Sequence, residues 1–170
     1  MSASDGRTDG NGGDPRGGPR ETAGVVAPPP VIFSVPLLLG LLANRRLGLG
    51  FVPEGLRKPV GFPLLAGGLG LGLWFFREMR AADTPVDPYR PVSRLVTSGP
   101  FRYTRNPAYL ALLANYLGVS VLKNSLPPLL LLPLVLYAMN RGVVEREEAY
   151  LREKFGEEYE AYLAQVPRWL

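Results

Sequence analysis

The chain has 170 residues, a formal net charge of +4, and neither cysteine nor histidine. This length suits a single domain. The missing cysteines exclude disulfides, thiolate nucleophiles and cysteine metal sites, and the missing histidines remove the usual ligands of zinc and haem. The carboxylates do not cluster as in a calcium loop, so we predict no metal.

Four apolar blocks dominate the layout, although hydrophobic residues make up only 46% of the chain and the mean hydropathy is +0.06. A polar N-terminal tail and a charged C-terminal segment dilute these blocks. Blocks that approach the roughly 20 residues of a membrane span favour an all-α fold, a polytopic membrane helix bundle. We expect about four transmembrane helices plus a C-terminal amphipathic helix. The basic residues lie beside apolar blocks, which argues against a nucleic-acid partner.

The N-terminal residues 1–24 are rich in Gly, Asp, Arg, Ser and Thr, so we predict a disordered tail there. It is not a signal peptide, because no apolar core directly follows its charged start. Residues 25–170 form the predicted membrane domain. The first span covers residues 25–43, is uncharged over 19 residues, and has Pro36 as an expected kink.

The second predicted span covers residues 60–76 and ends in aromatic side chains, which favour the water boundary of a membrane. Glycines at positions 67, 68, 70 and 72 suit close packing against another helix. The connection over residues 77–98 contains three prolines, so we expect a surface loop of turns.

The last two spans, residues 107–122 and 126–142, are joined by only three residues, which predicts an antiparallel helical hairpin. Residues 145–165 then have the pattern of one amphipathic helix lying over the cytoplasmic membrane face. Its expected apolar stripe contains Glu148, Leu151, Phe155, Tyr159 and Tyr162. Arg168 and Trp169 are expected to anchor the chain at the interface.

The distribution of Lys and Arg predicts the orientation of the four spans. The side that holds both termini and residues 77–105 carries 14 of these residues, and the opposite side carries 5. Because positive charges favour the cytoplasm, both termini should be cytoplasmic. We expect an integral membrane protein of a prokaryotic plasma membrane.

Residues 95–109, LVTSGPFRYTRNPAY, combine a Gly-Pro turn, tyrosines and arginines at the start of an apolar helix. Asn106 is a candidate N-cap and Pro107 fits the first helical turn. The free N–H groups of a helix start, with Arg102 and Arg105 beside them, suit a carboxylate or phosphate. The alternative is an ordinary helix start flanked by arginines that anchor the topology.

A second segment, residues 145–169, has the sequence EREEAYLREKFGEEYEAYLAQVPRW. Together the two segments resemble the isoprenylcysteine carboxyl methyltransferase and phospholipid methyltransferase family of integral membrane enzymes. The matching residues are Leu95, Val96, Gly99, Pro100, Arg105, Pro107 and Tyr109, then Glu147, Glu148, Leu151, Phe155, Gly156, Tyr159 and Tyr162. Asn106 stands where the family usually has histidine, and its amide still donates and accepts hydrogen bonds there.

The resemblance implies a methyltransferase that uses S-adenosylmethionine on a lipidic or membrane-embedded acceptor. Arg105 and Asn106 are the expected catalytic residues. The expected cofactor-binding residues are Gly99, Pro100, Tyr103, Arg105, Asn106, Pro107, Tyr109, Glu147 and Glu148. In these implied roles, Arg105 and the helix start hold the cofactor carboxylate, Glu147 or Glu148 holds its cationic end, and Tyr103 or Tyr109 packs on its adenine ring.

The family places the 77–98 connection over its pocket, so Thr84 and Asp87 are further candidates. A carboxylate acceptor is favoured because it arrives ionised, whereas an amine must lose a proton and this chain has no histidine base. Two other classes stay open: a membrane reductase related to sterol reductases, and a non-catalytic membrane bundle. The sequence leaves the oligomeric state open.

Overall fold

A computed structural model describes residues 22–86 and 90–170 of the chain. Every regular element within these ranges is helical. In chain order they are α1 (Pro29–Leu47), α2 (Glu54–Ala81), the 3-10 helix η1 (Gly99–Arg102), α3 (Pro107–Leu122), α4 (Leu126–Met139), the π-helical η2 (Asn140–Val144), α5 (Glu145–Phe155) and α6 (Glu157–Gln165). The predicted tail lies outside the described residues except for 22–24, where Ala23 is buried in the main apolar core.

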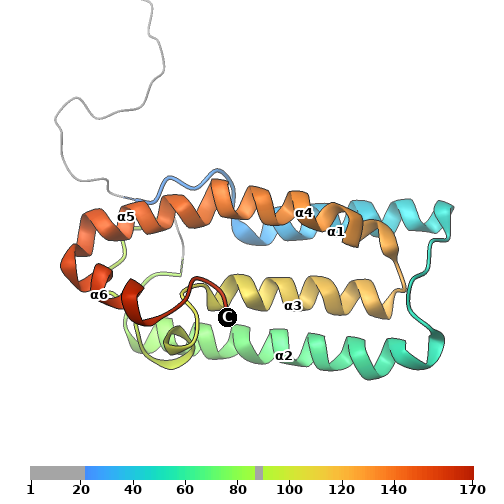
Figure 1. Ribbon diagram of the computed structural model, residues 1–170, viewed down its shortest axis with the longest axis horizontal. Helices are drawn as coiled ribbons and strands as arrows, with labels where there is room; N and C mark the ends of the chain where they lie inside the picture. Colours follow the sequence, from blue (N-terminus) through green and yellow to red (C-terminus); the bar gives the residue numbers. More distant parts are fainter. Residues whose placement is uncertain (1–21, 87–89) are drawn as a thin grey trace, which may run out of the picture.

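The long helices form two antiparallel pairs, α1 against α4 and α2 against α3, which stack on each other (Figure 1). The α1–α2 and α3–α4 connections lie at one end of this bundle. At the other end, α5 and α6 gather beside η1 and the start of α3. The fold therefore brings the two segments of the sequence motif to the same end of the molecule.

The α3–α4 hairpin has the bounds that the sequence predicts at its turn, with α3 over Pro107–Leu122 and α4 starting at Leu126. Asn124 occupies the turn with φ of 47°, a conformation that asparagine adopts more readily than most residues. Its Oδ1 accepts hydrogen bonds from the backbone N–H groups of Phe51 and Val52, both at 2.8 Å. One side chain thus ties together the two turns at this end.

The prediction of one separate helix over residues 145–165 is wrong, both where α5 begins and where it ends. At its start there is no gap, because α4 continues through η2 into α5 as one helix, Leu126–Phe155. At its end Gly156 adopts φ of 50° and ψ of −122° and separates α5 from α6. Only glycine adopts such a conformation cheaply. Nothing lies within 4 Å of where a Cβ at Gly156 would be, so the backbone conformation and not close packing favours glycine there.

The first two helices are shifted or longer relative to the expected spans. α1 begins four residues later than predicted, because Pro28 precedes it and Pro29 takes its first position. α2 has 28 residues, about 42 Å at 1.5 Å per residue, which exceeds the hydrocarbon thickness of a bilayer. The loop predicted from residue 77 therefore begins only after Ala81.

Within the described residues, three helices are long and apolar enough to cross a membrane: α1, α2 and the continuous helix from Leu126. The fourth apolar helix, α3, is shorter, with 16 residues. Many large apolar side chains face outward, among them Leu73 of α2 and Leu130 of α4. An outer surface of this kind suits lipid, and it fits a helical membrane protein.

Each helix pair has a point of close backbone contact at a glycine. A Cβ added to Gly40 of α1 would lie 2.6 Å from the backbone N of Pro128 in α4. A Cβ on Gly118 of α3 would lie 3.1 Å from the carbonyl oxygen of Gly61 in α2. Of the four glycines expected to make such contacts, Gly68 does so, while Gly67 and Gly70 have nothing within 4 Å and Gly72 makes ordinary contact.

The Gly40→Ala substitution is expected to destabilise the α1–α4 pair by about 1–3 kcal/mol, because the clashing atoms belong to backbone and cannot rotate away. Thermal unfolding in detergent measures the effect. Gly67→Ala is the matched control and should be neutral or stabilising by up to about 1 kcal/mol, since alanine favours helix. Equal stability of the two variants would contradict the close contact.

Candidate active site

The start of α3 is held by hydrogen bonds to a chain segment about 60 residues away. Asn106 occupies the N-cap position, but the expected side-chain cap is wrong, because its side chain makes no bond to the first turn. Instead Asn106 Nδ2 donates to the carbonyl oxygen of Arg168 at 2.8 Å. Thr104 Oγ1 donates to the same oxygen at 3.1 Å and accepts the Asn106 backbone N–H. The C-terminal segment, residues 166–170, is thus fastened to this helix start.

Arg105 lies between these two fastening residues and points its side chain inward. Its backbone N–H donates to the carbonyl oxygen of Pro167 at 3.0 Å. Its guanidinium donates from Nη1 to Glu148 Oε1 at 3.0 Å, and the side chain is 16% exposed. Its Nε is buried and has no hydrogen-bond partner. Arg105 therefore keeps one buried donor unused.

Glu148 of α5 is a buried carboxylate, 5% exposed, which two arginines share. Arg168 donates to Glu148 Oε1 from Nε at 2.9 Å and to Oε2 from Nη2 at 2.6 Å. This two-pronged bond raises the pKa of the Arg168 guanidinium above its ordinary value. Arg168 therefore has a partner inside the protein, which the expectation of an interfacial anchor did not include. With Arg105, this cluster carries two positive charges and one negative charge.

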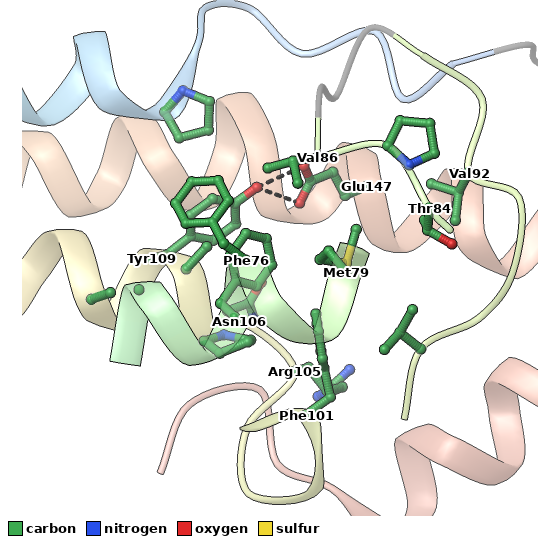
Figure 2. A pocket seen from close by; sticks show the side chains of 18 of the residues that line it. Phe76, Met79, Thr84, Val86, Val92, Phe101, Arg105, Asn106, Tyr109 and Glu147 are labelled. Carbon is green, nitrogen blue, oxygen red and sulfur yellow. Dashed lines mark hydrogen bonds between the residues drawn. The ribbon is translucent and has the colours of Figure 1, made fainter. Parts of the chain in front are cut away.

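Glu147, the next residue, points to a different partner. Tyr109 Oη donates to its carboxylate, 2.6 Å from Oε1 and 2.7 Å from Oε2, as Figure 2 shows. Glu147 follows the apolar stretch that ends at Val144, and it lies outside the predicted 126–142 span. Burial raises the pKa of its carboxyl to about 7, the Tyr109 hydrogen bond opposes this rise, and the charge of Glu148 adds to it. No arginine pairs with Glu147 among the described residues.

These side chains border a cavity of about 600 Å³ between α2, α3, α5, α6 and the loop after α2 (Figure 2). Most of its wall is apolar. Five of the predicted site residues line it: Arg105, Asn106, Pro107, Tyr109 and Glu147. Thr84 also lines it and is 6% exposed, while Asp87 lies outside the described residues. Among the described residues, the charged ones in the lining are Arg90, Arg94, Arg105 and Glu147.

The other four predicted residues lie around the cavity without lining it. Glu148 is covered by the two arginines. Gly99 has φ of 59°, and a Cβ there would clash with the carboxylate of Glu78, which also accepts a hydrogen bond from Ser98. Pro100 is buried beside this turn, and Tyr103 is 62% exposed near Trp74. These residues shape the loop that leads into α3.

Several residues at the site were not predicted from the sequence. Arg168 and Thr104 carry the bonds that close the helix start, and Asn140 of η2 accepts from Arg168 Nη1 at 3.3 Å. Residues 23 and 28–30, before and at the start of α1, also line the cavity. No spacing rule links these positions to the motif, and Arg168 lies 20 residues after Glu148, so no local sequence signal identifies it.

Comparison with known proteins gives a consistent family. The chain is 38% identical over 73 residues to a protein-S-isoprenylcysteine O-methyltransferase of Schizosaccharomyces pombe. This match covers 43% of the chain and 31% of the relative, so it spans less than a third of that protein. The relative is eukaryotic and gives no support to the prediction of a prokaryotic plasma membrane. No solved structure matches the chain significantly.

The match to a family extends much further along the chain than the match to this relative. Residues 56–158 match the phospholipid methyltransferase family, and they run from α2 to the start of α6. They include Arg105, Tyr109 and Glu147 of the cavity wall and the buried Glu148. Because this match covers more than half of the chain, the protein belongs to the phospholipid methyltransferase family.

Proposed function

We propose that the protein is a membrane methyltransferase that moves a methyl group from S-adenosylmethionine to a lipidic acceptor that bears a carboxylate. One observation carries the choice of site: a single cavity holds the unused donor of Arg105 and the arginine-free carboxylate of Glu147. The family and the relative's name support the reaction type.

The charges of the cavity fit the amino-acid end of S-adenosylmethionine, which carries a carboxylate and an ammonium group. The Arg105, Glu148 and Arg168 cluster has a net positive charge and an unused N–H, which suits the carboxylate. Glu147 suits the ammonium. The cavity volume of about 600 Å³ lies within the range of ordinary cofactor sites.

Two glutamates were candidates for the cationic end, and the contacts favour Glu147. Glu148 accepts three hydrogen bonds from Arg105 and Arg168 and is covered by them. We propose that Glu148 positions Arg105, and that Asn106 positions the C-terminal segment through the Arg168 carbonyl. Tyr109 holds the Glu147 carboxylate by its hydroxyl hydrogen bond. The proposed roles of Gly99, Pro100 and Tyr103 are to shape the loop before α3.

When bound, S-adenosylmethionine supplies an electrophilic methyl group. The protein needs no nucleophile of its own for such a displacement, so its residues act by holding the two reactants in line. Arg94 and the cluster of Arg105, Glu148 and Arg168 carry more positive charge than Glu147 carries negative charge, and this excess favours an anionic acceptor. The apolar wall excludes water, which strengthens these charge interactions.

The proposed topology has four spans, with α3 as the fourth beside the three long helices. Its 16 residues extend about 24 Å, a little less than a bilayer core, and the polar side chains of Tyr116 and Ser120 are buried in the bundle. The Lys and Arg asymmetry supports cytoplasmic N and C termini. Reporter fusions at both termini should report the cytoplasm, whereas a C terminus on the opposite side would overturn this orientation.

Binding measurements on the full chain in detergent test the proposed function. Labelled S-adenosylmethionine should bind to the wild-type protein, and NADPH should not, which separates the methyltransferase from the reductase and from a non-catalytic bundle. Arg105→Lys should weaken cofactor binding about tenfold or more, about 1.4 kcal/mol. Lysine lacks the planar fork of donors that serves Glu148 and a second carboxylate together.

Arg152→Lys is the matched control for Arg105→Lys, since Arg152 pairs with Glu160 on the surface and is 49% exposed. Cofactor affinity should be unchanged in this variant. Thermal stability is measured on the same samples. If the affinity of both variants merely followed their stability, or if Arg105→Lys bound like wild type, the assignment of Arg105 to the cofactor carboxylate would be lost.

The raised pKa of Glu147 predicts two opposite pH trends. Without ligand, the folded state favours the protonated carboxyl more than the unfolded state does. Stability should therefore fall as pH rises from about 4.5 to about 7 and change little above that from this group. Cofactor affinity should rise over pH 6 to 7, because the ionised carboxylate attracts the ammonium group.

Glu147→Gln should remove both trends and weaken cofactor binding at neutral pH. Thermal unfolding and equilibrium binding across this pH range measure them. The control is Glu158→Gln on the exposed face of α6, which should keep both trends. Wild-type pH profiles in Glu147→Gln would show that another group titrates and would remove Glu147 from the proposed site.

A further inference from the structure

The cavity contains a second polar position, deep among the apolar helices. The described residues include three buried side-chain N or O atoms without a hydrogen-bond partner: Arg105 Nε, Asn115 Oδ1 and Ser125 Oγ. Two of them, those of Arg105 and Asn115, belong to side chains that line this one cavity. The first lies at its cofactor end. The second has no role in the function proposed so far.

Asn115 lies near the middle of α3, eight residues after Pro107, which places it about 12 Å along the helix axis from the helix start. Near it the cavity wall is formed by Gly68 and Leu69 of α2 and by Ala111 and Leu112 of α3. All four are apolar. Asn115 is the polar group in this deep part of the described cavity wall.

The other polar side chains in the middle and second half of α3 are occupied. Tyr116 Oη donates to the carbonyl oxygen of Pro128 at 2.6 Å, which ties α3 to α4. Ser120 Oγ donates to the carbonyl oxygen of Tyr116 at 2.7 Å. The side chain of Asn115 makes no hydrogen bond to any described residue. It therefore forms no hydrogen bond between helices, which is the usual structural role of such a residue in a membrane.

The amide of Asn115 lies against Gly68, where the missing side chain leaves room for it. A Cβ at Gly68 would lie 2.5 Å from Asn115 Oδ1. The terminal torsion of asparagine is broad, so the amide can turn from this notch toward the cavity. A polar group in apolar surroundings without a partner is costly, by about 1–3 kcal/mol in proteins. A ligand that supplies the partner would recover this energy.

We infer that Asn115 is a specificity-determining residue that recognises a hydrogen-bond donor, a hydroxyl or amide N–H, within the apolar body of the acceptor. The acceptor is then an amphiphile with its methylated group near Arg105 and a donor up to about 12 Å away. This inference rests on the proposed function, because it assumes that the acceptor enters this cavity. An acceptor that lacks this donor leaves the Asn115 oxygen without a hydrogen-bond partner. The protein should therefore discriminate strongly between acceptors that differ only in this one group.

Matched amphiphiles test the inference on the full chain in detergent. The probes are stearic acid and a series of its monohydroxylated derivatives, in which the hydroxyl moves along the chain. Wild type should bind at least one hydroxylated probe about tenfold more tightly than stearic acid. Asn115→Leu, which is similar in shape and has no polar atom, should bind that probe and stearic acid equally. Its thermal stability should equal or exceed that of wild type.

Ser120→Ala is the matched control, since it removes a satisfied polar group from the same helix outside the cavity. It should keep the wild-type preference. Asn115→Ala repeats the test if leucine does not fit, with the same equal binding expected. Equal binding of all probes by wild type, or a preference that survives in both Asn115 variants, would overturn the inference. So would a marked loss of stability in both, because Asn115 would then serve the fold.

Binding of labelled S-adenosylmethionine to the same samples separates this inference from the proposed function. Asn115→Leu should bind it like wild type, because Asn115 lies away from Arg105 and Glu147. If wild type does not bind it, the proposed function fails. If wild type binds it but shows no preference for a hydroxylated probe, only the role of Asn115 fails.

Discussion

The carboxylate of Glu148, shared by Arg105 and Arg168, is the interaction on which the site depends. It joins three parts of the chain that are far apart in sequence: the start of α3, the helix α5 and the C-terminal segment. Removing one partner of such a buried pair typically costs about 3–5 kcal/mol, because the remaining charge is left uncompensated. Two arginines around one carboxylate leave an excess positive charge. Because of that charge, the cluster can bind an anion in addition to linking the three chain segments.

The same interaction explains why two adjacent glutamates have different properties. Consecutive residues on a helix point in directions about 100° apart, so Glu147 and Glu148 cannot share one environment. Glu148 points to the arginines and is compensated, whereas Glu147 points into the cavity and meets only the hydroxyl of Tyr109. Burial without a cation raises its pKa to about 7. A cationic ligand group would complete the environment of Glu147, and this asymmetry gives the proposed site its positive and negative ends.

Strong local signals in the sequence predict the ends of helices well. They fail where contacts between distant parts of the chain determine the structure. Asn-Pro and a three-residue linker predict the bounds of α3 and the start of α4, because a proline in the first helical turn and a short turn act locally. The continuity of α4 with α5 was missed, since a drop in hydropathy marks the end of a span and not the end of a helix. The role of Arg168 was missed because 63 residues separate it from Arg105 and no periodicity connects them. The family pattern placed both glutamates at the site, but only the contacts distinguish their roles.

Asn106 illustrates how the C-terminal segment changes the meaning of a motif position. Its amide donates to the carbonyl oxygen of Arg168, and that bond requires a neutral or cationic N–H donor at this place. Histidine, usual in the family, can donate from a ring nitrogen, so the two residues are compatible in this one respect. They differ in charge, because histidine titrates near neutral pH while the asparagine amide does not. In this chain the hydrogen bond from Asn106 that holds the C-terminal segment is therefore insensitive to pH. The same applies to the orientation of Glu148, which depends on this segment through Arg168. Glu147 is then the group of this site that titrates near neutral pH.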